Sequence, residues 1–210
     1  FSAFCSTTLC SSLPVWSGGA AMITARRSLG GAGTQNAAVG FGGAIPANAV
    51  TCTEEYNGST WTAGGALGTA RRALSGAGTQ TAGLAFGGNA TTFTNITEEY
   101  DGSSWTSVNS MNTARGYMGG CGLQTAALGF GGYTPPTGAA TEQYDGSSWT
   151  TSPATLATAR YNGGGAGSTT AALLMGGTTG SLTSATEEYN FSATVTTGAA
   201  WASGGNINTS

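Results

Sequence analysis

The chain has 210 residues but a mass of only 20.6 kDa, because 37 of its residues are glycine, and its formal net charge is −3. Charged residues make up 7% of the sequence, against roughly 25% in ordinary soluble domains, whereas an aromatic content of 9% favours a packed fold over disorder. Six scattered arginines argue against a nucleic-acid partner, and no apolar stretch reaches the ~18 residues of a membrane span.

Residues 1–19 are atypical of the chain. They lack the basic start and long apolar core of a signal peptide, and the absence of an initiator methionine leads us to expect a mature form or a fragment. Their apolar content is high for a disordered terminal segment, so we expect ordered strands here. Cys5 could form a disulfide with Cys10 or with Cys52, and either bond would fit an extracellular setting.

From Trp16 onward, four motifs recur at intervals of about 44 residues. They are a Thr-Ala-Arg (TAR) motif, a double glycine that follows an apolar residue, a TE(E/Q)Y segment and a predicted strand that contains Trp. A fixed period of roughly 40–50 residues is typical of repeat architectures. The predicted units are 20–63, 64–107, 108–151 and 152–189, followed by a closing segment, 190–210, in one domain that spans residues 1–210.

The third unit illustrates the predicted strands of one repeat. Residues 116–122 form a glycine-rich apolar run, and residues 126–132 predict a short buried strand that ends at a double glycine. After a variable loop come an alternating strand at 140–144 and a Trp strand at 149–151, separated by the hairpin signal DGSS. No window has apolar residues at helical spacing. Each unit is therefore predicted to be a four-stranded antiparallel meander, which is the form of a propeller blade.

The set of motifs in residues 87–115, GG…TEEYDGSSWTSVNSMNTAR with the loop omitted, resembles the kelch repeat. Residues 78–88, GTQTAGLAFGG, are similar to kelch-like repeat proteins encoded by aquatic bacteriophages and environmental bacteria. The resemblance spans about residues 16–189 and implies an all-β, kelch-like β-propeller of four-stranded antiparallel blades. The very small residues throughout and the stretched fourth unit, between Tyr189 and Trp201, depart from the kelch pattern.

The number of blades does not follow directly from the four repeats. Five Trp strands and a length of about 4.8 periods favour five blades, the last assembled from residues 1–19 and the segment after Tyr189. Four blades with additional terminal strands are the alternative. In a third arrangement the ring closes between chains, and the N-terminal strand completes a neighbouring subunit by strand addition.

The repeated charged and aromatic residues are predicted to be scaffold. An Arg fork can bind a carboxylate and nearby carbonyl groups where blades meet, whereas a catalytic acid–base pair is needed only once and in unequal environments. The predicted ion pairs join Arg26, Arg71, Arg115 and Arg160 to Glu54, Glu98, Glu142 and Glu187. The aromatic residues predicted to pack between sheets are Trp16, Trp61, Trp105, Trp149 and Trp201, with Tyr56, Tyr100, Tyr144 and Tyr189.

Other chemistry is poorly represented in the sequence. The absence of histidine removes Ser-His-Asp and Cys-His catalysis and the common zinc and copper sites, so we expect no catalytic residues, no metal site and no cofactor. Glycine runs such as residues 30–33 lack the Lys of a phosphate-binding loop and are expected to allow close packing of inner strands. Cys52 and Cys121 occupy positions held by small core residues in other repeats, and Cys121 is expected to be a free buried thiol.

These features predict a non-enzymatic structural and binding module of an extracellular or virion surface, such as a phage tail fibre or decoration protein. Self-association, other virion proteins and a glycan are the expected partners. Recognition is expected in four variable loops on one face, at residues 44–50, 89–95, 133–139 and 178–184. The alternative is a self-assembling extracellular filament subunit with strand exchange between neighbours, and a glycan-active enzyme is a minor one.

Overall fold

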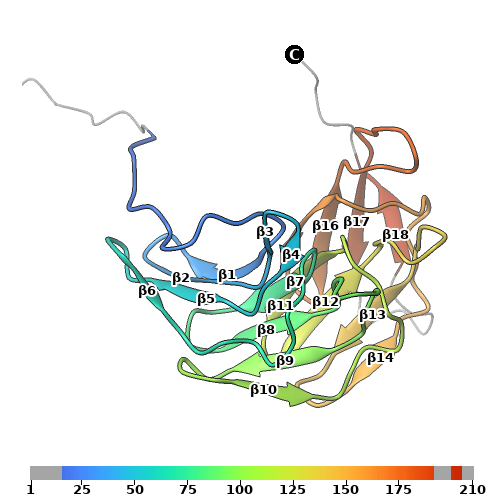
Figure 1. Ribbon diagram of the computed structural model, residues 1–210. Helices are drawn as coiled ribbons and strands as arrows, with labels where there is room; N and C mark the ends of the chain where they lie inside the picture. The colour runs from blue at the N-terminus through green and yellow to red at the C-terminus, as the bar shows by residue number, and fades with distance from the viewer. Residues whose placement is uncertain (1–15, 192–199, 205–210) are drawn as a thin grey trace, which may run out of the picture.

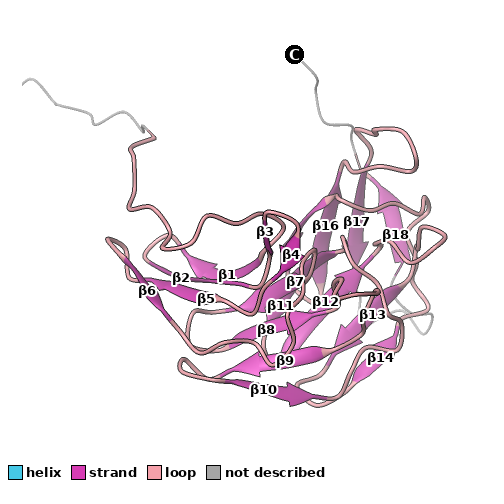
Figure 2. Cartoon of the chain, viewed as in Figure 1, coloured by secondary structure: helices cyan, strands magenta, loops and turns pink. Residues whose placement is uncertain are grey.

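The computed structural model describes residues 16–191 and 200–204, and its strands form four antiparallel four-stranded sheets in a propeller arrangement (Figure 1). A further small sheet pairs β3 (Ala44–Ile45) with β4 (Asn48–Ala49). None of the described residues forms a helix, so no helix among them is long enough to cross a membrane (Figure 2). The predicted all-β fold is confirmed.

Each of the four sheets, numbered here as blades 1 to 4, contains the strands of one sequence repeat, and blade 4 also takes its last strand from the predicted closing segment. Blade 1 contains β1 (Gly30–Thr34), β2 (Ala37–Phe41), β5 (Thr53–Tyr56) and β6 (Trp61–Ala63). Blade 2 contains β7 (Ser75–Gly78), β8 (Gly83–Phe86), β9 (Thr97–Tyr100) and β10 (Trp105–Val108). Blade 3 contains β11 (Gly119–Leu123), β12 (Ala126–Phe130), β13 (Thr141–Tyr144) and β14 (Trp149–Thr151). Blade 4 contains β15 (Gly164–Gly167), β16 (Ala171–Met175), β17 (Thr186–Asn190) and β18 (Ala200–Ser203).

The register of the outer two strands is the same in every blade. A Tyr at the end of the third strand lies opposite the Trp of the fourth, as in the pair Tyr100 and Trp105. In blades 2 and 3 the hairpin between them is fixed by an aspartate, because Asp101 Oδ1 accepts hydrogen bonds from the backbone N–H groups of Ser103 and Ser104. The following Gly102 has a φ of 91°, a conformation that glycine adopts without steric cost.

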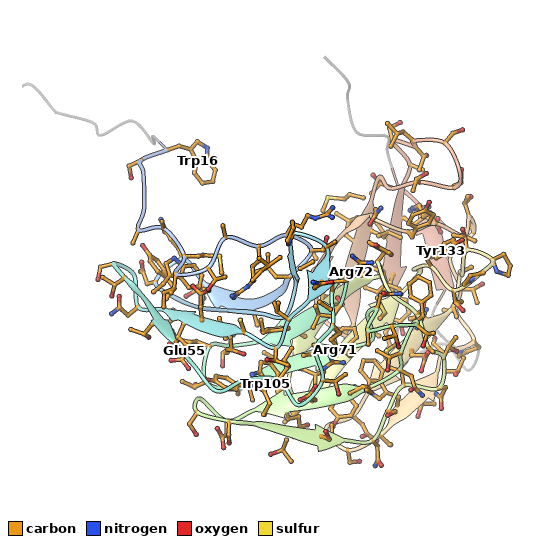
Figure 3. The ribbon with its side chains drawn as sticks, viewed as in Figure 1. Trp16, Glu55, Arg71, Arg72, Trp105 and Tyr133 are labelled. Carbon is orange, nitrogen blue, oxygen red and sulfur yellow. The ribbon has the colours of Figure 1, made fainter. Side chains whose placement is uncertain are left out.

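The C-terminal Trp strand belongs to the fourth blade. In β18, Trp201 lies opposite Tyr189, so residues 200–203 complete a sheet that would otherwise have three strands. The longer spacing before Trp201 therefore lengthens one connection and does not begin a new blade. The expected composite fifth blade is not formed by the described residues, and Trp16 lies on an extended segment that leads into blade 1 (Figure 3). Residues 1–15, which include most of the N-terminal part of the predicted closing blade and both cysteines of the possible Cys5–Cys10 disulfide, are outside the described part.

The apolar core lies between the blades. Among the described residues, one buried cluster joins each pair of consecutive blades. Between blades 2 and 3, for example, Leu84 and Phe86 pack with Ala127 and Trp149. The inner strands β1, β7, β11 and β15 pack in that order, and no comparable packing joins β15 back to β1 in the described chain. The four blades thus form an open series with two unlike end faces.

Glycine in the inner strands permits this close packing, as expected from the sequence. A Cβ atom added at Gly76 of β7 would lie 2.5 Å from the carbonyl oxygen of Gly31 in β1. One added at Gly120 of β11 would lie 2.7 Å from the ring of Phe86 and still nearer to the Ser75 hydroxyl. A side chain at these positions therefore separates adjacent blades.

Replacing Gly120 by alanine should lower the free energy of unfolding by about 1–3 kcal/mol, the usual cost of overpacking a filled core. Gly164→Ala is the control, because a Cβ there lies at an ordinary 3.6 Å from its nearest neighbour, the Met175 methyl group. Urea denaturation of both variants measures the difference. Equal stabilities would show that the inner strands tolerate a side chain.

Candidate functional site

The four repeated arginines each pair with the glutamate of their own repeat. The oxygen–nitrogen distances are 2.6 Å for Arg26–Glu54, 3.0 Å for Arg71–Glu98 and 3.1 Å for Arg115–Glu142, and Arg160 pairs likewise with Glu187. Every one of these side chains is at most 4% exposed. The four glutamates are therefore shielded from solvent and equivalent to one another, an arrangement that suits a scaffold better than acid–base chemistry.

In blade 3, the Arg115 guanidinium also satisfies three carbonyl groups. Its Nη1 donates to Gly131 O at 2.8 Å and Ala140 O at 2.5 Å, and its Nη2 donates to Gly129 O at 3.2 Å and to Glu142. Burial lowers the pKa of Arg115, and the negative charge of Glu142 partly opposes this effect. The side chain thus ties the segment entering the blade to β12 and β13.

The guanidinium bonds remain within one blade, which refines the expectation that these arginines join neighbouring blades. These arginines contact the preceding blade through their backbone. Arg160 O accepts a hydrogen bond of 2.9 Å from Gly132 N, and Arg71 and Arg115 accept equivalent bonds from the double glycines of the preceding blades. One residue therefore organises its own blade with its side chain and contacts the previous blade with its carbonyl group.

Arg115→Ala should lower the free energy of unfolding by about 3–5 kcal/mol, because it leaves the buried carboxylate of Glu142 without its cation. Arg72→Ala is the matched control. Arg72 is partly exposed, donates to one loop carbonyl, Ala47 O, and is replaced by Gly116 or Tyr161 in other repeats. Thermal and urea denaturation should show a small loss for Arg72→Ala, and a similarly small loss for Arg115→Ala would refute the role assigned to the pair.

The repeated aromatic residues reach from one blade into the preceding blade. The Trp105 ring packs on Phe41 with ring centroids 4.8 Å apart, and its Nε1 donates to Thr53 Oγ1 at 2.9 Å. Trp149 makes the same contacts with Phe86 and Thr97. The hydroxyl group of Tyr144 donates to Glu99 at 2.8 Å, and that of Tyr100 donates to Glu55. Tyr189 is buried at the same position of blade 4.

The outermost members of this series differ. Trp16 is fully exposed (Figure 3), and the side chain of Trp201 is outside the described residues. The Trp61 indole donates to Ala20 O at 3.2 Å, and the Tyr56 and Trp61 rings stack 5.0 Å apart. Blade 1 has no preceding blade in the described chain, so Tyr56 and Trp61 lack the inter-blade contacts of their counterparts.

The inter-blade tyrosines should make the protein sensitive to alkaline pH. The pKa of Tyr100 is raised to about 12, mainly by burial and secondly by the hydrogen bond to Glu55. Burial raises the pKa of Tyr144 as well. A pKa that is higher in the folded state means that the stabilisation is complete below the ordinary value of about 10 and is lost as pH rises toward 12. Urea midpoints measured from pH 9 to 12 should fall above pH 10. Tyr100→Phe should reduce this slope, whereas an unchanged slope would contradict the assignment.

Cys52 and Cys121 are free thiols. Cys121 is buried, as expected, and burial raises the pKa of its thiol to about 11. Cys52 is partly exposed and forms no disulfide. Among the residues that the structure describes, no group of three or more cysteine or acidic side chains could hold a metal ion.

A non-repeated group of aromatic residues lies on the loop face, the end of the blades that carries the loops after the double glycines. We call Phe93, Tyr117, Tyr133 and Tyr161 the aromatic cluster. Ring centroids are 5.1 Å apart for Tyr133–Tyr161, 5.4 Å for Phe93–Tyr133, 6.2 Å for Tyr117–Tyr161 and 6.4 Å for Phe93–Tyr117. All four side chains are partly exposed. Because they come from three repeats, the cluster extends over blades 2, 3 and 4 (Tyr133 is labelled in Figure 3).

Isolated backbone bridges hold the cluster in place. Tyr133 pairs with Gly116 and with Thr137, and Tyr161 pairs with Thr178, so each loop is pinned to the segment that enters its blade. Tyr117 lies beside a cavity of about 270 Å³ on the propeller axis, which is lined by equivalent residues of all four repeats. In the described part of the chain, the hydroxyl groups of Tyr117, Tyr133 and Tyr161 have no hydrogen-bond partner, so they can bond to a ligand.

The aromatic cluster is not part of the repeated scaffold. The chain has seven tyrosines, of which four recur in the TE(E/Q)Y motif, and the other three all lie in the cluster. The position of Tyr117 is occupied by Ser28, Ala73 and Asn162 in the other repeats. A residue that a blade required would recur in every repeat. Phe93 and Tyr133 lie in two of the loops predicted to carry recognition, whereas Tyr117 and Tyr161 lie in the segments that enter blades 3 and 4. These side chains were not singled out from the sequence, although the three tyrosines are the ones that do not recur in the TE(E/Q)Y motif.

Comparison with known proteins adds no assignment: neither a protein-family model nor a curated protein matches the sequence. The function is therefore argued from the geometry of the loop face.

Proposed function

We propose that the protein is a non-enzymatic binding module whose aromatic cluster recognises a glycan. The observation that carries the proposal is the gathering of the three non-repeated tyrosines with Phe93 on the loop face. Loops on a rigid scaffold are the usual place for recognition. Here the scaffold is the set of buried ion pairs, and the variable segments lie outside it.

A sugar matches the chemistry of the cluster. Tyrosine combines a large apolar ring with a polar tip, so it can pack against the C–H face of a pyranose while its hydroxyl group bonds to a sugar hydroxyl. The cluster contains no charged residue, which favours a neutral sugar over an anionic one. The planes of the partly exposed rings are inclined to one another by 56° to 69°, so the rings present several tilted surfaces and not a flat platform.

The sequence supports a setting on an extracellular or virion surface. The repeat motifs resemble kelch-like proteins of bacteriophages and environmental bacteria, and the chain has few charged residues and no lysine. Six arginines, of which four are buried in ion pairs, leave few sites for trypsin-like proteases. We therefore propose a structural role, such as part of a tail fibre or decoration protein, combined with glycan recognition.

Affinity electrophoresis in gels that contain neutral polysaccharides tests this function. The protein should migrate more slowly in at least one polysaccharide of a panel of bacterial and algal glycans, and Tyr133→Ala and Tyr161→Ala should abolish the retardation. Trp16→Ala is the control, because Trp16 is an exposed aromatic residue outside the cluster. Retardation that survives both tyrosine substitutions, or its absence throughout the panel, would count against glycan binding. The appearance of cleaved glycan would instead support the enzymatic alternative.

A further inference from the structure

The outer face of blade 4 is exposed at positions that are buried in the other blades. Leu173 of β16 is partly exposed, whereas its counterparts Val39, Leu84 and Leu128 are each at most 1% exposed. Glu188 is exposed and has no partner in the described residues, although its counterparts Glu55 and Glu99 accept hydrogen bonds from tyrosines of the next blade. Ala166 and Thr186 are likewise more exposed than the corresponding residues of the other blades. We call this surface the blade 4 face.

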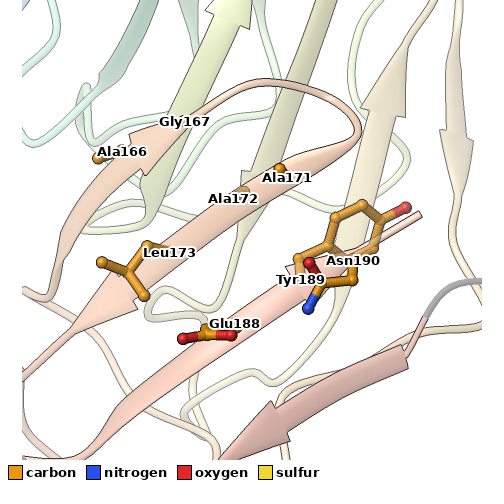
Figure 4. Close-up of a pocket in the computed structure, with 8 residues that line it drawn as sticks. All are labelled: Ala166, Gly167, Ala171, Ala172, Leu173, Glu188, Tyr189 and Asn190. Atoms are coloured by element: carbon orange, nitrogen blue, oxygen red, sulfur yellow. The ribbon is translucent and has the colours of Figure 1, made fainter. Parts of the chain in front are cut away.

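The blade 4 face has a hollow where blades 1 and 2 each receive a glutamine from the next blade. At the first two junctions, a turn glutamine donates to two carbonyl groups of the preceding blade: Gln80 Nε2 to Ala38 O and Tyr56 O, and Gln124 Nε2 to Gly83 O and Tyr100 O. In blade 4 the residues at these two carbonyl positions are Ala172 and Tyr189. They line an open hollow of about 310 Å³ together with Glu188 and Leu173 (Figure 4).

Blade 1 has the complementary residues on its opposite face. Gln35 occupies the turn position of Gln80 and Gln124, but it is exposed and has no partner in the described chain. Tyr56 corresponds to Tyr100 and Tyr144, yet its hydroxyl group reaches no carboxylate in the described residues. A Cβ atom added at Gly31 would meet only its own blade, at 3.4 Å from Val39 O, whereas Gly76 and Gly120 face a preceding blade. We call this surface the blade 1 face.

The hydrogen bonds around the axis end at the same two faces. Ala73 N donates to Ser28 O, Tyr117 N to Ala73 O, and Asn162 N to Tyr117 O, at 2.8 to 2.9 Å. Among the described residues, this series ends with the N–H group of Ser28 in blade 1 and the carbonyl group of Asn162 in blade 4. Gly177 N also lacks the Arg carbonyl that its three counterparts contact. Each face therefore has the donors or acceptors that the other face lacks.

We propose that the blade 1 face of one copy packs on the blade 4 face of a second copy and reproduces the junction between consecutive blades. Gln35 then donates to the carbonyl groups of Ala172 and Tyr189, Tyr56 donates to Glu188, and Ser28 N donates to Asn162 O. The Tyr56 and Trp61 rings cover Leu173. This contact needs no strand exchange, in contrast to the assembly expected from the sequence.

A second copy is the occupant that these faces indicate, because each is one half of the same repeated interface. The contact is head to tail, so it produces either a closed ring or an open filament. Each chain contributes four blades, and two copies joined at both ends make a ring of eight, which is the upper end of the usual range of about four to eight. Two copies are therefore the number of chains that keeps a ring closed in this way within that range.

The test is the molar mass of the purified chain, measured by light scattering during size-exclusion chromatography over a range of concentrations. The expected mass is twice 20.6 kDa. Gln35→Ala should weaken the dimer by about tenfold or more, since it removes two hydrogen bonds at each junction. Gly31→Ala should have a larger effect, because a Cβ atom there would strike β15 of the neighbouring copy as one at Gly76 would strike β1.

Neither substitution removes a contact within a single chain, so circular dichroism should show that both variants are folded. Leu182→Ala is the control for nonspecific association, because Leu182 is 94% exposed on the loop face and should not affect the dimer. A chain that stays monomeric at high concentration would overturn the proposal. So would a dimer that neither Gln35→Ala nor Gly31→Ala weakens. Loss of association with Leu182→Ala alone would indicate a different interface and would equally overturn it.

Discussion

The buried ion pair of each blade is the interaction on which the rest of the structure depends. Nine acidic and six basic side chains are available, and four of each are buried as pairs, one pair in each repeat. An ionised group can be buried only if its charge and its hydrogen bonds are satisfied. The guanidinium therefore fixes carbonyl groups of its blade, three of them for Arg71 and for Arg115. The carboxylate fixes N–H groups of the incoming segment, as Glu142 does with Asn112 and Thr113. The TAR and TE(E/Q)Y motifs recur because each pair needs both.

Once each blade is fixed in this way, very small residues can build the junctions. Glycine in the inner strands lets the blades approach closely, and aromatic residues in the outer strands fill the wider space away from the axis. Trp105 and Trp149 each combine apolar packing with a hydrogen bond to the preceding blade. The same division explains why an unpaired blade face exposes backbone acceptors and apolar side chains together.

Much of this architecture follows from the sequence, because scaffold residues recur at a fixed period. The strands of each repeat, the all-β fold and the burial of Cys121 could all be predicted from one alignment of the chain with itself. The assignment of Trp201 could not, because the choice between a fourth and a fifth blade depends on whether a strand pairs with Tyr189 or with a distant segment. The aromatic cluster was missed for a related reason. Phe93, Tyr133 and Tyr161 are far apart in sequence, and only the stacking of three blades brings them together.

The central claim is that the Arg–Glu pair acts as a unit that organises its blade, and a double-mutant cycle at Arg115 and Glu142 tests it most directly. Arg115→Met, Glu142→Gln and the double variant are compared with the unmodified chain by urea denaturation. The account predicts that each single substitution is strongly destabilising and that the double variant loses at least about 1 kcal/mol less than the sum of the two, because neither charge is left unpaired. Losses that add to within about 0.5 kcal/mol would show that the two side chains contribute independently, and would contradict the account.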